Sequence, residues 1–346
     1  MSRLTKPLPV SIVLGILVLA FQFTNVASLA NFTGISFGFL LLTLLIHELG
    51  HVLFGVWAGY RFNFLTVGPL TIENSDRMHI KVNESWFLFG GAASCSPLTD
   101  ELTAIAKQHK LFAAGGPIFS AAAALISLSF GIPMDLDLAI YLGMFNSAIF
   151  IVTILPTNGA LKSDGRVLLE LSRGGEQTKE FLISLLLLKE MNSPLHPSEW
   201  SEELINRVKT MKPSSDNIMI AYMIFYYTLL KDGYDCASAL IEPYKQIPVT
   251  KKNKLSLQFI SHIRQLDSIF SGNKNLEEMK KLHEYLSPLE PVSYKRSEAI
   301  LAKLKGDEQQ AHQKIAEVLK ETKKRKKIYG FFYAEEQLTE LLKTKQ

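Results

Sequence analysis

The chain has 346 residues, 47% of them hydrophobic, and a formal net charge of +4, so it is long enough for two domains. The small net charge, without a basic stripe interleaved with aromatic residues, excludes a nucleic-acid partner. Residues 1–169 contain long apolar runs and few charges, whereas residues 170–346 carry most of the Lys, Arg, Asp and Glu. This division predicts a membrane half followed by a soluble half.

The first apolar run covers residues 9–29 and follows Arg3 and Lys6. A charged start and a small-x-small sequence at 28–30 are also features of a cleaved signal peptide. Because a second apolar run begins almost at once, we favour a retained transmembrane helix within residues 1–32, with a signal sequence as the alternative.

Three further apolar runs follow at 33–58, 111–132 and 136–155, each long enough to span a bilayer. The run at 111–132 is rich in Ala and Gly, which permits close contact between helices. With four spans in total, every loop that carries Lys or Arg falls on one side of the membrane. The positive-inside rule then places that side, and both chain termini, in the cytoplasm.

Residues 61–92, between the second and third apolar runs, alternate loosely and are rich in β-branched and aromatic residues. They predict a small β-sheet or hairpin close to the membrane, with a turn at residues 73–76. Residues 100–110 are expected to form a short helix that leads into the next span. An edge strand of the sheet could hold an extended substrate as an added strand, or it could be purely structural.

Residues 171–346 have the pattern of soluble amphipathic helices. Gly233, Gly272 and Gly306 each lie in a turn between two helices, at about the spacing of tetratricopeptide-like hairpins. We predict an all-α, solenoid-like domain that binds a peptide or protein partner, with a compact helical domain as the alternative. The basic run at 323–327 indicates either a solvated helix end or contact with anionic lipid headgroups.

The sequence His47-Glu48-Leu49-Gly50-His51 interrupts the second apolar run. On a helix, His47 and His51 lie on one face, about 6 Å apart along the axis, so both imidazoles can bind one Zn²⁺. Glu48 can take a proton from the metal-bound water, whose pKa zinc lowers toward about 7. Ionisable residues in a lipid-embedded helix are functional by default, because burying them there is costly. A polar cluster satisfied between helices is the alternative.

A catalytic zinc needs a third protein ligand and an open coordination position. Asp164 follows the last span, on the same predicted side as the two histidines, whereas Asp135 and Asp137 fall on the opposite side. Gly165 would free the backbone beside Asp164 to turn sharply. The residues alone leave Asp164 as either the third ligand or an ordinary turn aspartate.

These motifs resemble those of the site-2 protease family of intramembrane zinc metalloproteases. His47 to His51 match the family's zinc helix, Ala114-Gly115-Gly116-Pro117 is similar to its Gly-Pro signature, and Pro156 with Ser163-Asp164-Gly165 resembles its Asn-x-x-Pro…Asp-Gly element. The resemblance covers residues 33–170, which it marks as the metalloprotease membrane domain.

The resemblance implies that His47, His51 and Asp164 bind zinc and that Glu48 is the catalytic acid and base. The position of the family's asparagine, three residues before the proline, is Thr153 here. Either of two other asparagines could hold the substrate strand, and the Gly-Pro signature adds two further candidates for substrate binding. These candidate substrate-binding residues are Asn146, Asn158, Gly116 and Pro117.

The sequence therefore predicts an intramembrane endopeptidase with one Zn²⁺ per chain, in which Glu48 activates a zinc-bound water. The expected substrate is a single-span membrane protein or a signal-peptide remnant. The expected location is a bacterial plasma membrane, since some bacterial members of the family carry helical-repeat extensions. The other hypotheses are a catalytically idle membrane scaffold whose helical domain recruits partners, and a solute transporter, which four spans without an internal repeat fit poorly.

Overall fold

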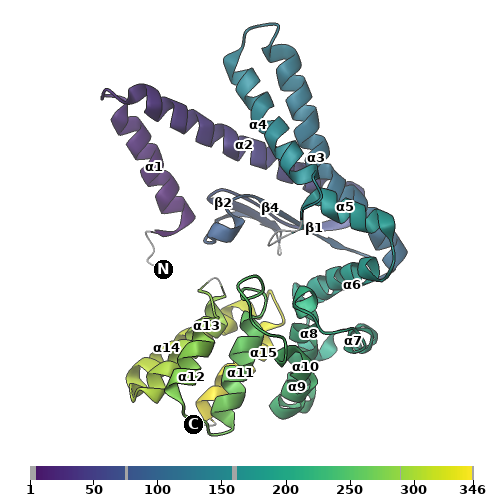
Figure 1. Cartoon of the computed structure of the whole chain (residues 1–346), viewed down its shortest axis with the longest axis vertical. Coiled ribbons are helices and arrows are strands. Elements are labelled where there is room, and N and C mark those ends of the chain that lie inside the picture. Colours follow the sequence, from purple (N-terminus) through teal and green to yellow (C-terminus); the bar gives the residue numbers. More distant parts are fainter. Residues whose placement is uncertain (1–4, 75–76, 158–161, 289, 345–346) are drawn as a thin grey trace. The chain divides into compact units, whose positions relative to one another are not determined.

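The computed structural model describes residues 5–74, 77–157, 162–288 and 290–344 (Figure 1). In these residues the chain forms fifteen α-helices and one four-stranded antiparallel sheet, which agrees with the predicted mostly helical fold with a small sheet. The chain divides into two compact units, Met1–Leu182 (unit 1) and Ile183–Gln346 (unit 2). The division falls inside α6 (Glu176–Met191).

Unit 1 contains the apolar helices, the sheet and the first of the amphipathic helices. Its elements before α6 are α1 (Pro7–Phe21), α2 (Ala27–Trp57), β1 (Tyr60–Val67), β2 (Leu70–Asn74), β3 (Met78–Val82), the 3₁₀ turn η2 (Trp86–Leu88), β4 (Ala92–Pro97), α3 (Leu102–Gly131), α4 (Asp137–Ile154) and α5 (Asp164–Arg173).

Among the described residues, three helices are long and apolar enough to cross a membrane: α2, α3 and α4. Large apolar side chains point outward from them, for example Phe32 on α2 and Leu125 and Phe130 on α3. An outward apolar surface on long helices is stable in lipid and unfavourable in water. The expected short helix at 100–110 is the start of α3, which runs without a break to Gly131.

The first apolar run forms a shorter helix than the predicted transmembrane span. It forms α1, a helix of 15 residues, which is shorter than the roughly 20 residues that cross a bilayer. The structure therefore has three membrane-length helices where the sequence predicted four. Helix α1 folds back along α2, where Gly34 leaves room for Val18: a Cβ at Gly34 would lie 2.9 Å from the Val18 side chain.

The N-terminal end of α1 reaches the segment between β3 and β4. Lys6 forms an ion pair with Glu84 at 2.7 Å, and the Trp86 indole N–H donates to the carbonyl of Thr5 at 2.8 Å. Figure 1 shows α3 and α4 as an antiparallel pair joined by a short turn at their far end. The start of α1, the sheet and the start of α5 therefore share one end of unit 1.

The sheet confirms the predicted β-structure after the second apolar run, with strand order β3-β2-β1-β4 and every pair antiparallel. Strand β1 is central, and Leu65 on it faces Ile72 of β2 on one side and Ala93 of β4 on the other. The two edges are β3 and β4, and residues 68–69 join β1 to β2. Of the predicted turn at 73–76, the first two residues end β2 and the other two lie outside the described residues.

All regular secondary structure in the described residues of unit 2 is helical. Its elements are η3 (Pro197–Glu199), α7 (Glu202–Lys209), η4 (Ser215–Asn217), α8 (Ile218–Asp232), α9 (Tyr234–Leu240), α10 (Glu242–Lys245), α11 (Gln258–Phe270), α12 (Leu276–His283), α13 (Pro291–Leu304), α14 (Glu308–Arg325) and α15 (Phe332–Thr344).

The three glycines singled out in the sequence each separate two helices of unit 2. Gly233, Gly272 and Gly306 have φ angles of 90°, 84° and 83°, a region in which side chains with a Cβ are strained. They join α8 to α9, α11 to α12 and α13 to α14, as the helix–turn–helix pattern predicted. In the basic run that follows, Arg325 pairs with Glu321 and Lys326 with Glu336, so part of its charge is neutralised within the unit.

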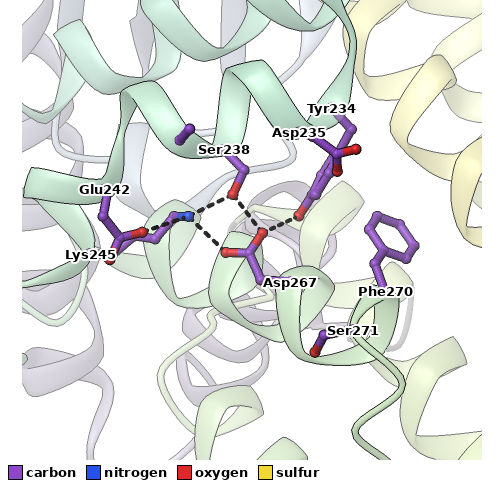
Figure 2. Close-up of a pocket in the computed structure, with 9 residues that line it drawn as sticks. Tyr234, Asp235, Ser238, Glu242, Lys245, Asp267, Phe270 and Ser271 are labelled. Carbon is purple, nitrogen blue, oxygen red and sulfur yellow. Dashed lines mark hydrogen bonds and ion pairs between the residues drawn. The ribbon is translucent and has the colours of Figure 1, made fainter.

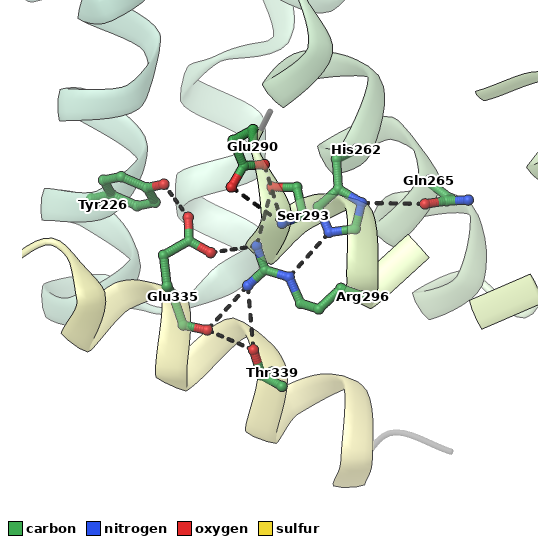
Figure 3. Close-up of polar contacts among 8 residues, drawn as sticks. All are labelled: Tyr226, His262, Gln265, Glu290, Ser293, Arg296, Glu335 and Thr339. Carbon is green, nitrogen blue, oxygen red and sulfur yellow. Dashed lines mark hydrogen bonds and ion pairs between the residues drawn. The ribbon is translucent and has the colours of Figure 1, made fainter. Parts of the chain in front are cut away.

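A buried polar network centred on Arg296 links α8, α11, α13 and α15 (Figure 3). The guanidinium is fully buried and pairs with the carboxylate of Glu335, which also accepts a hydrogen bond from the Tyr226 hydroxyl. Its other N–H groups donate to the Glu335 carbonyl and the side chains of His262, Ser293 and Thr339. A network with all donors satisfied holds the four helices in one arrangement.

This network makes the stability of unit 2 depend on pH. Burial, and then the charge of Arg296, lowers the pKa of His262 well below its ordinary value of 6.5. The folded chain keeps His262 neutral while the unfolded chain protonates it below pH 6.5, so this stability is full above pH 6.5 and declines as pH falls. We expect a loss of up to about 1.4 kcal/mol per pH unit between pH 6.5 and 5.

Hydrogen exchange of the α11 and α13 amides in the full chain, corrected for intrinsic rates, measures this loss. The His262→Gln variant keeps an acceptor for Arg296 and should flatten the pH dependence. His312→Gln, at an exposed position of α14, should leave it unchanged. An equal slope in wild type and His262→Gln would contradict the prediction.

Candidate metal centre

The two histidines of α2 lie on one buried face of the helix, with exposed fractions of 4% for His47 and 6% for His51. His47 Nδ1 lies 3.0 Å from the Ser120 hydroxyl, and His51 Nδ1 lies 2.8 Å from the Phe112 carbonyl. Both partners belong to α3, so the outer nitrogens are occupied and the two Nε2 atoms face inward, 3.2 Å apart.

Helices α2 and α3 approach closely enough for these contacts because they cross at two glycines. A Cβ on Gly50 would lie 2.3 Å from the Gly115 carbonyl oxygen, and a Cβ on Gly115 would lie equally close to the Gly50 oxygen. Contacts this close require glycine on both helices, as is common where membrane helices meet. The crossing brings the imidazoles against the face of α3 formed by Phe112, Gly116 and Ser120.

Asp164 is brought to the histidines by the start of α5. The Ser163 hydroxyl donates to the Leu155 carbonyl at 2.6 Å and accepts from the backbone N–H groups of Thr157 and Arg166, which ties the start of α5 to the end of α4. A Cβ on Gly165 would lie 1.8 Å from the Ile154 carbonyl oxygen. Gly165 is therefore needed for this close approach, and not for the sharp turn that the sequence suggested.

The carboxylate of Asp164 completes a cluster with both imidazoles. Its Oδ2 lies 3.2 Å from His47 Nε2, and its Oδ1 lies 3.4 Å from His51 Nε2. Burial raises the pKa of Asp164, but the two histidines, in their protonated form, lower it to about 2 through hydrogen bonds and charge that outweigh burial. The carboxylate is therefore ionised, as a metal ligand must be.

The donor set fits a zinc ion. Two ligand atoms that are each about 2.0–2.1 Å from a tetrahedral zinc lie about 3.3 Å from one another. His47 Nε2 and His51 Nε2 are 3.2 Å apart, which matches this spacing. The Asp164 carboxylate faces both rings, with Oδ2 3.2 Å from His47 Nε2 and Oδ1 3.4 Å from His51 Nε2. Two imidazoles and one carboxylate also leave a fourth position open, as catalytic zinc sites require.

The hydrogen bond of His51 supports a cation at this position. The Phe112 carbonyl can only accept, so His51 Nδ1 carries the hydrogen, and a neutral ring then presents an Nε2 lone pair. This lone pair faces His47 Nε2 and the Asp164 carboxylate. Convergence of electron-rich atoms in a buried place is unfavourable unless a metal ion or an added proton lies between them.

Glu48 lies on the side of α2 that faces the sheet. The Ala93 backbone N–H of β4 hydrogen bonds to its carboxylate. Gly91 adopts a φ of 100°, and a Cβ there would lie 2.7 Å from Glu48 Oε1. Glu48 is thus held between the face of α2 that carries His47 and His51 and the edge strand β4.

The other predicted substrate-binding residues lie in different environments. Gly116 abuts the imidazoles, and Pro117 is buried inside α3, where it removes one helical hydrogen bond. Asn146 is fully buried, donates to Thr43 and the Leu142 carbonyl, and has no hydrogen-bond partner for its Oδ1 among the described residues. Asn158 lies outside the described residues.

Substitution of Gly116 should empty the metal site. A Cβ at this position would lie 2.3 Å from His51 Nε2 and 2.7 Å from His47 Nε2, where a metal would bind. We expect Gly116→Ala to lower the zinc content of the purified chain to a small fraction of the wild-type value. Gly38→Ala, on α2 with open space at the Cβ position, is the matched control and should retain zinc. Wild-type zinc content in Gly116→Ala would show that the ion binds elsewhere.

Ser120 and Phe112 were missed by the sequence analysis. Phe112, Gly116 and Ser120 are spaced four residues apart, so they share one face of α3, and this spacing was the available signal for Ser120. The backbone carbonyl of Phe112 leaves no sequence signal. His109 of α3 is also buried, with its Nδ1 3.2 Å from the Tyr60 hydroxyl.

Unit 2 contains a separate cavity of about 360 Å³ between α9, α10 and α11 (Figure 2). Lys245 pairs there with Asp267 at 2.9 Å and Glu242 at 3.1 Å, and the hydroxyls of Tyr234 and Ser238 donate to Asp267. The central ammonium and carboxylate thus satisfy each other. This arrangement stabilises the helices and offers no group poised for chemistry.

No protein-family model matches the chain, and no curated protein or solved structure is detectably similar to it. The resemblance to the site-2 protease family therefore depends on the motifs and on the meeting of His47, His51 and Asp164 in one cluster.

Proposed function

We propose that this protein is an intramembrane zinc endopeptidase of the site-2 protease type. The observation that carries the proposal is the convergence of His47 Nε2, His51 Nε2 and the Asp164 carboxylate at separations that suit one zinc ion, beside the carboxylate of Glu48. His47, Glu48 and His51 lie on α2, which is of membrane length, so the reaction would take place at or within the bilayer.

Zinc bound by these ligands would act as a Lewis acid and make water acidic enough to lose a proton near neutral pH. Glu48 would accept a proton from the attacking water and return it to the amine that leaves when the peptide bond breaks. Ser120 and the Phe112 carbonyl would hold the rings of His47 and His51 during these steps. Burial of both imidazoles limits the access of bulk water to this chemistry.

The sheet supplies a place for an extended substrate. Strand β4 is an edge of the sheet and hydrogen bonds to Glu48 through Ala93, so a peptide added along β4 would bring its backbone toward the carboxylate. An apolar groove of about 370 Å³ lies between α2 and the sheet, lined by residues such as Leu45, Leu65 and Ile72. Both features suit an unwound stretch of a single-span membrane protein or a signal-peptide remnant.

The segments with Lys and Arg support a cytoplasmic location for the metal-centre end of unit 1. Lys6, Lys162 and Arg166 lie at that end, whereas the turn between α3 and α4 carries Asp135. We infer a bacterial plasma membrane with this end, and both termini, in the cytoplasm. The hairpins of unit 2 would act as a tetratricopeptide-like platform for a protein partner.

Metal analysis and a cleavage assay on the full chain in detergent test the proposal together. We expect about one zinc per chain, and cleavage of a model single-span substrate that stops when a chelator removes the metal. His47→Ala should lose zinc and activity together. A chain that holds zinc but cuts no membrane substrate would support the idle scaffold, and a chain without zinc would refute the enzyme.

A further inference from the structure

We propose that Ser120 is a positioning residue for the metal: its hydroxyl holds His47 in the tautomer and ring orientation that present Nε2 to the ion. The proposal rests on the proposed zinc site and adds a side chain of α3 that lies outside the His-Glu-x-x-His and Asp-Gly motifs.

The contact is short and shielded. His47 Nδ1 lies 3.0 Å from Ser120 Oγ, and the exposed fractions of His47 and Ser120 are 4% and 0%. A neutral imidazole carries one N–H, on either Nδ1 or Nε2. When Ser120 accepts a hydrogen bond from Nδ1, Nε2 keeps its lone pair and can bind a metal.

A competing state explains why His47 needs this acceptor. His47 Nε2 lies 3.2 Å from Asp164 Oδ2, so the other tautomer would donate an N–H directly to the carboxylate. That hydrogen bond would occupy two of the three ligands at once. Without the Ser120 hydroxyl, the N–H on Nδ1 that the metal-binding tautomer requires would be buried without a partner, which weakens metal binding by His47.

The two histidines differ in how they are held. His51 donates to the Phe112 backbone carbonyl, which remains after any side-chain substitution on α3. His47 depends on a side chain, so the partner that holds its ring can be removed by a single substitution. Of the two groups that hold the imidazoles, the Ser120 hydroxyl can therefore be tested by substitution, whereas the Phe112 backbone carbonyl cannot.

Zinc affinity of the full chain in detergent, measured by competition with a chromogenic chelator, tests the proposal. Ser120→Ala should raise the zinc dissociation constant about 10–100-fold. Ser120→Thr keeps the hydroxyl and should restore most of the affinity. Ser147→Ala is the matched control, because the Ser147 hydroxyl donates to the Gly143 carbonyl within α4 and its loss should leave zinc affinity unchanged.

The melting temperature of the zinc-free chain separates positioning from a purely structural role. We expect Ser120→Ala to melt near wild type without zinc and to show a smaller zinc-induced rise. Ser120→Gly repeats the test if the threonine or alanine variant does not fold.

Two outcomes overturn the proposal. Wild-type zinc affinity in Ser120→Ala would refute positioning while leaving the proposed metal site intact. A fall in the melting temperature of zinc-free Ser120→Ala, without a change in affinity, would assign Ser120 to packing alone. If wild type itself holds no zinc, the proposed function fails first, so the two failures are distinguishable.

Discussion

Replacing Glu48 by glutamine is expected to lower kcat for peptide cleavage by about 10²–10⁴-fold while leaving the zinc content of the chain unchanged. Glu48 is absent from the cluster of His47, His51 and Asp164, so the zinc content should not depend on it. Glutamine keeps the size of the side chain and an acceptor for the Ala93 N–H, but it cannot take up a proton.

The measurement combines metal analysis with single-turnover cleavage of a single-span substrate by the full chain. Glu101→Gln, at an exposed position before α3, should cleave at the wild-type rate. His47→Ala should differ from Glu48→Gln by losing the metal as well. Unchanged cleavage by a zinc-loaded Glu48→Gln chain would remove Glu48 from the mechanism.

Glu335→Gln in unit 2 is expected to lower the free energy of unfolding by about 3–5 kcal/mol. Arg296 is fully buried, and its charge would remain there without a carboxylate. The variant also weakens the contact with the Tyr226 hydroxyl. Native-state hydrogen exchange of α13 and α15 in the full chain measures the loss, since both helices are anchored by this pair.

The neighbouring Glu336 provides a matched control for that variant. It pairs with Lys326 at 2.6 Å at a partly exposed position, so Glu336→Gln should cost at most about 1 kcal/mol. The double replacement Arg296→Met with Glu335→Leu removes both charges and should recover most of the lost stability. If Glu335→Gln and Glu336→Gln lowered the free energy of unfolding equally, the buried pair would contribute no more to stability than the exposed one.

The site could be predicted from sequence where the pattern was local. His47 and His51 are four residues apart inside an apolar run, and helical geometry alone puts them on one face. The turns at Gly233, Gly272 and Gly306 were equally local, because positive φ angles favour glycine. The sheet was expected from its composition, although its edge strands could not be assigned before the pairing order was known.

The sequence interpretation was wrong where tertiary contacts decided the outcome. The first apolar run was counted as a span by hydropathy, yet its helix ends at Phe21, since the chain turns back to pack along α2. Gly165 was assigned to a turn, whereas it is required by the close approach of α5 to Ile154. The burial of His109 has no local sequence signal, because its partner Tyr60 lies in a strand far from it in sequence.

By itself the sequence determined that the chain has an apolar, membrane-length part with a zinc-binding pattern and a helical soluble part, since these depend on periodicity and composition. The tertiary structure alone decided that Asp164 joins His47 and His51, and that Ser120 and the Phe112 carbonyl orient the two rings. The physical reason is the crossing of α2 and α3 at Gly50 and Gly115. Contacts across such a crossing depend on the helix separation, which no local pattern encodes.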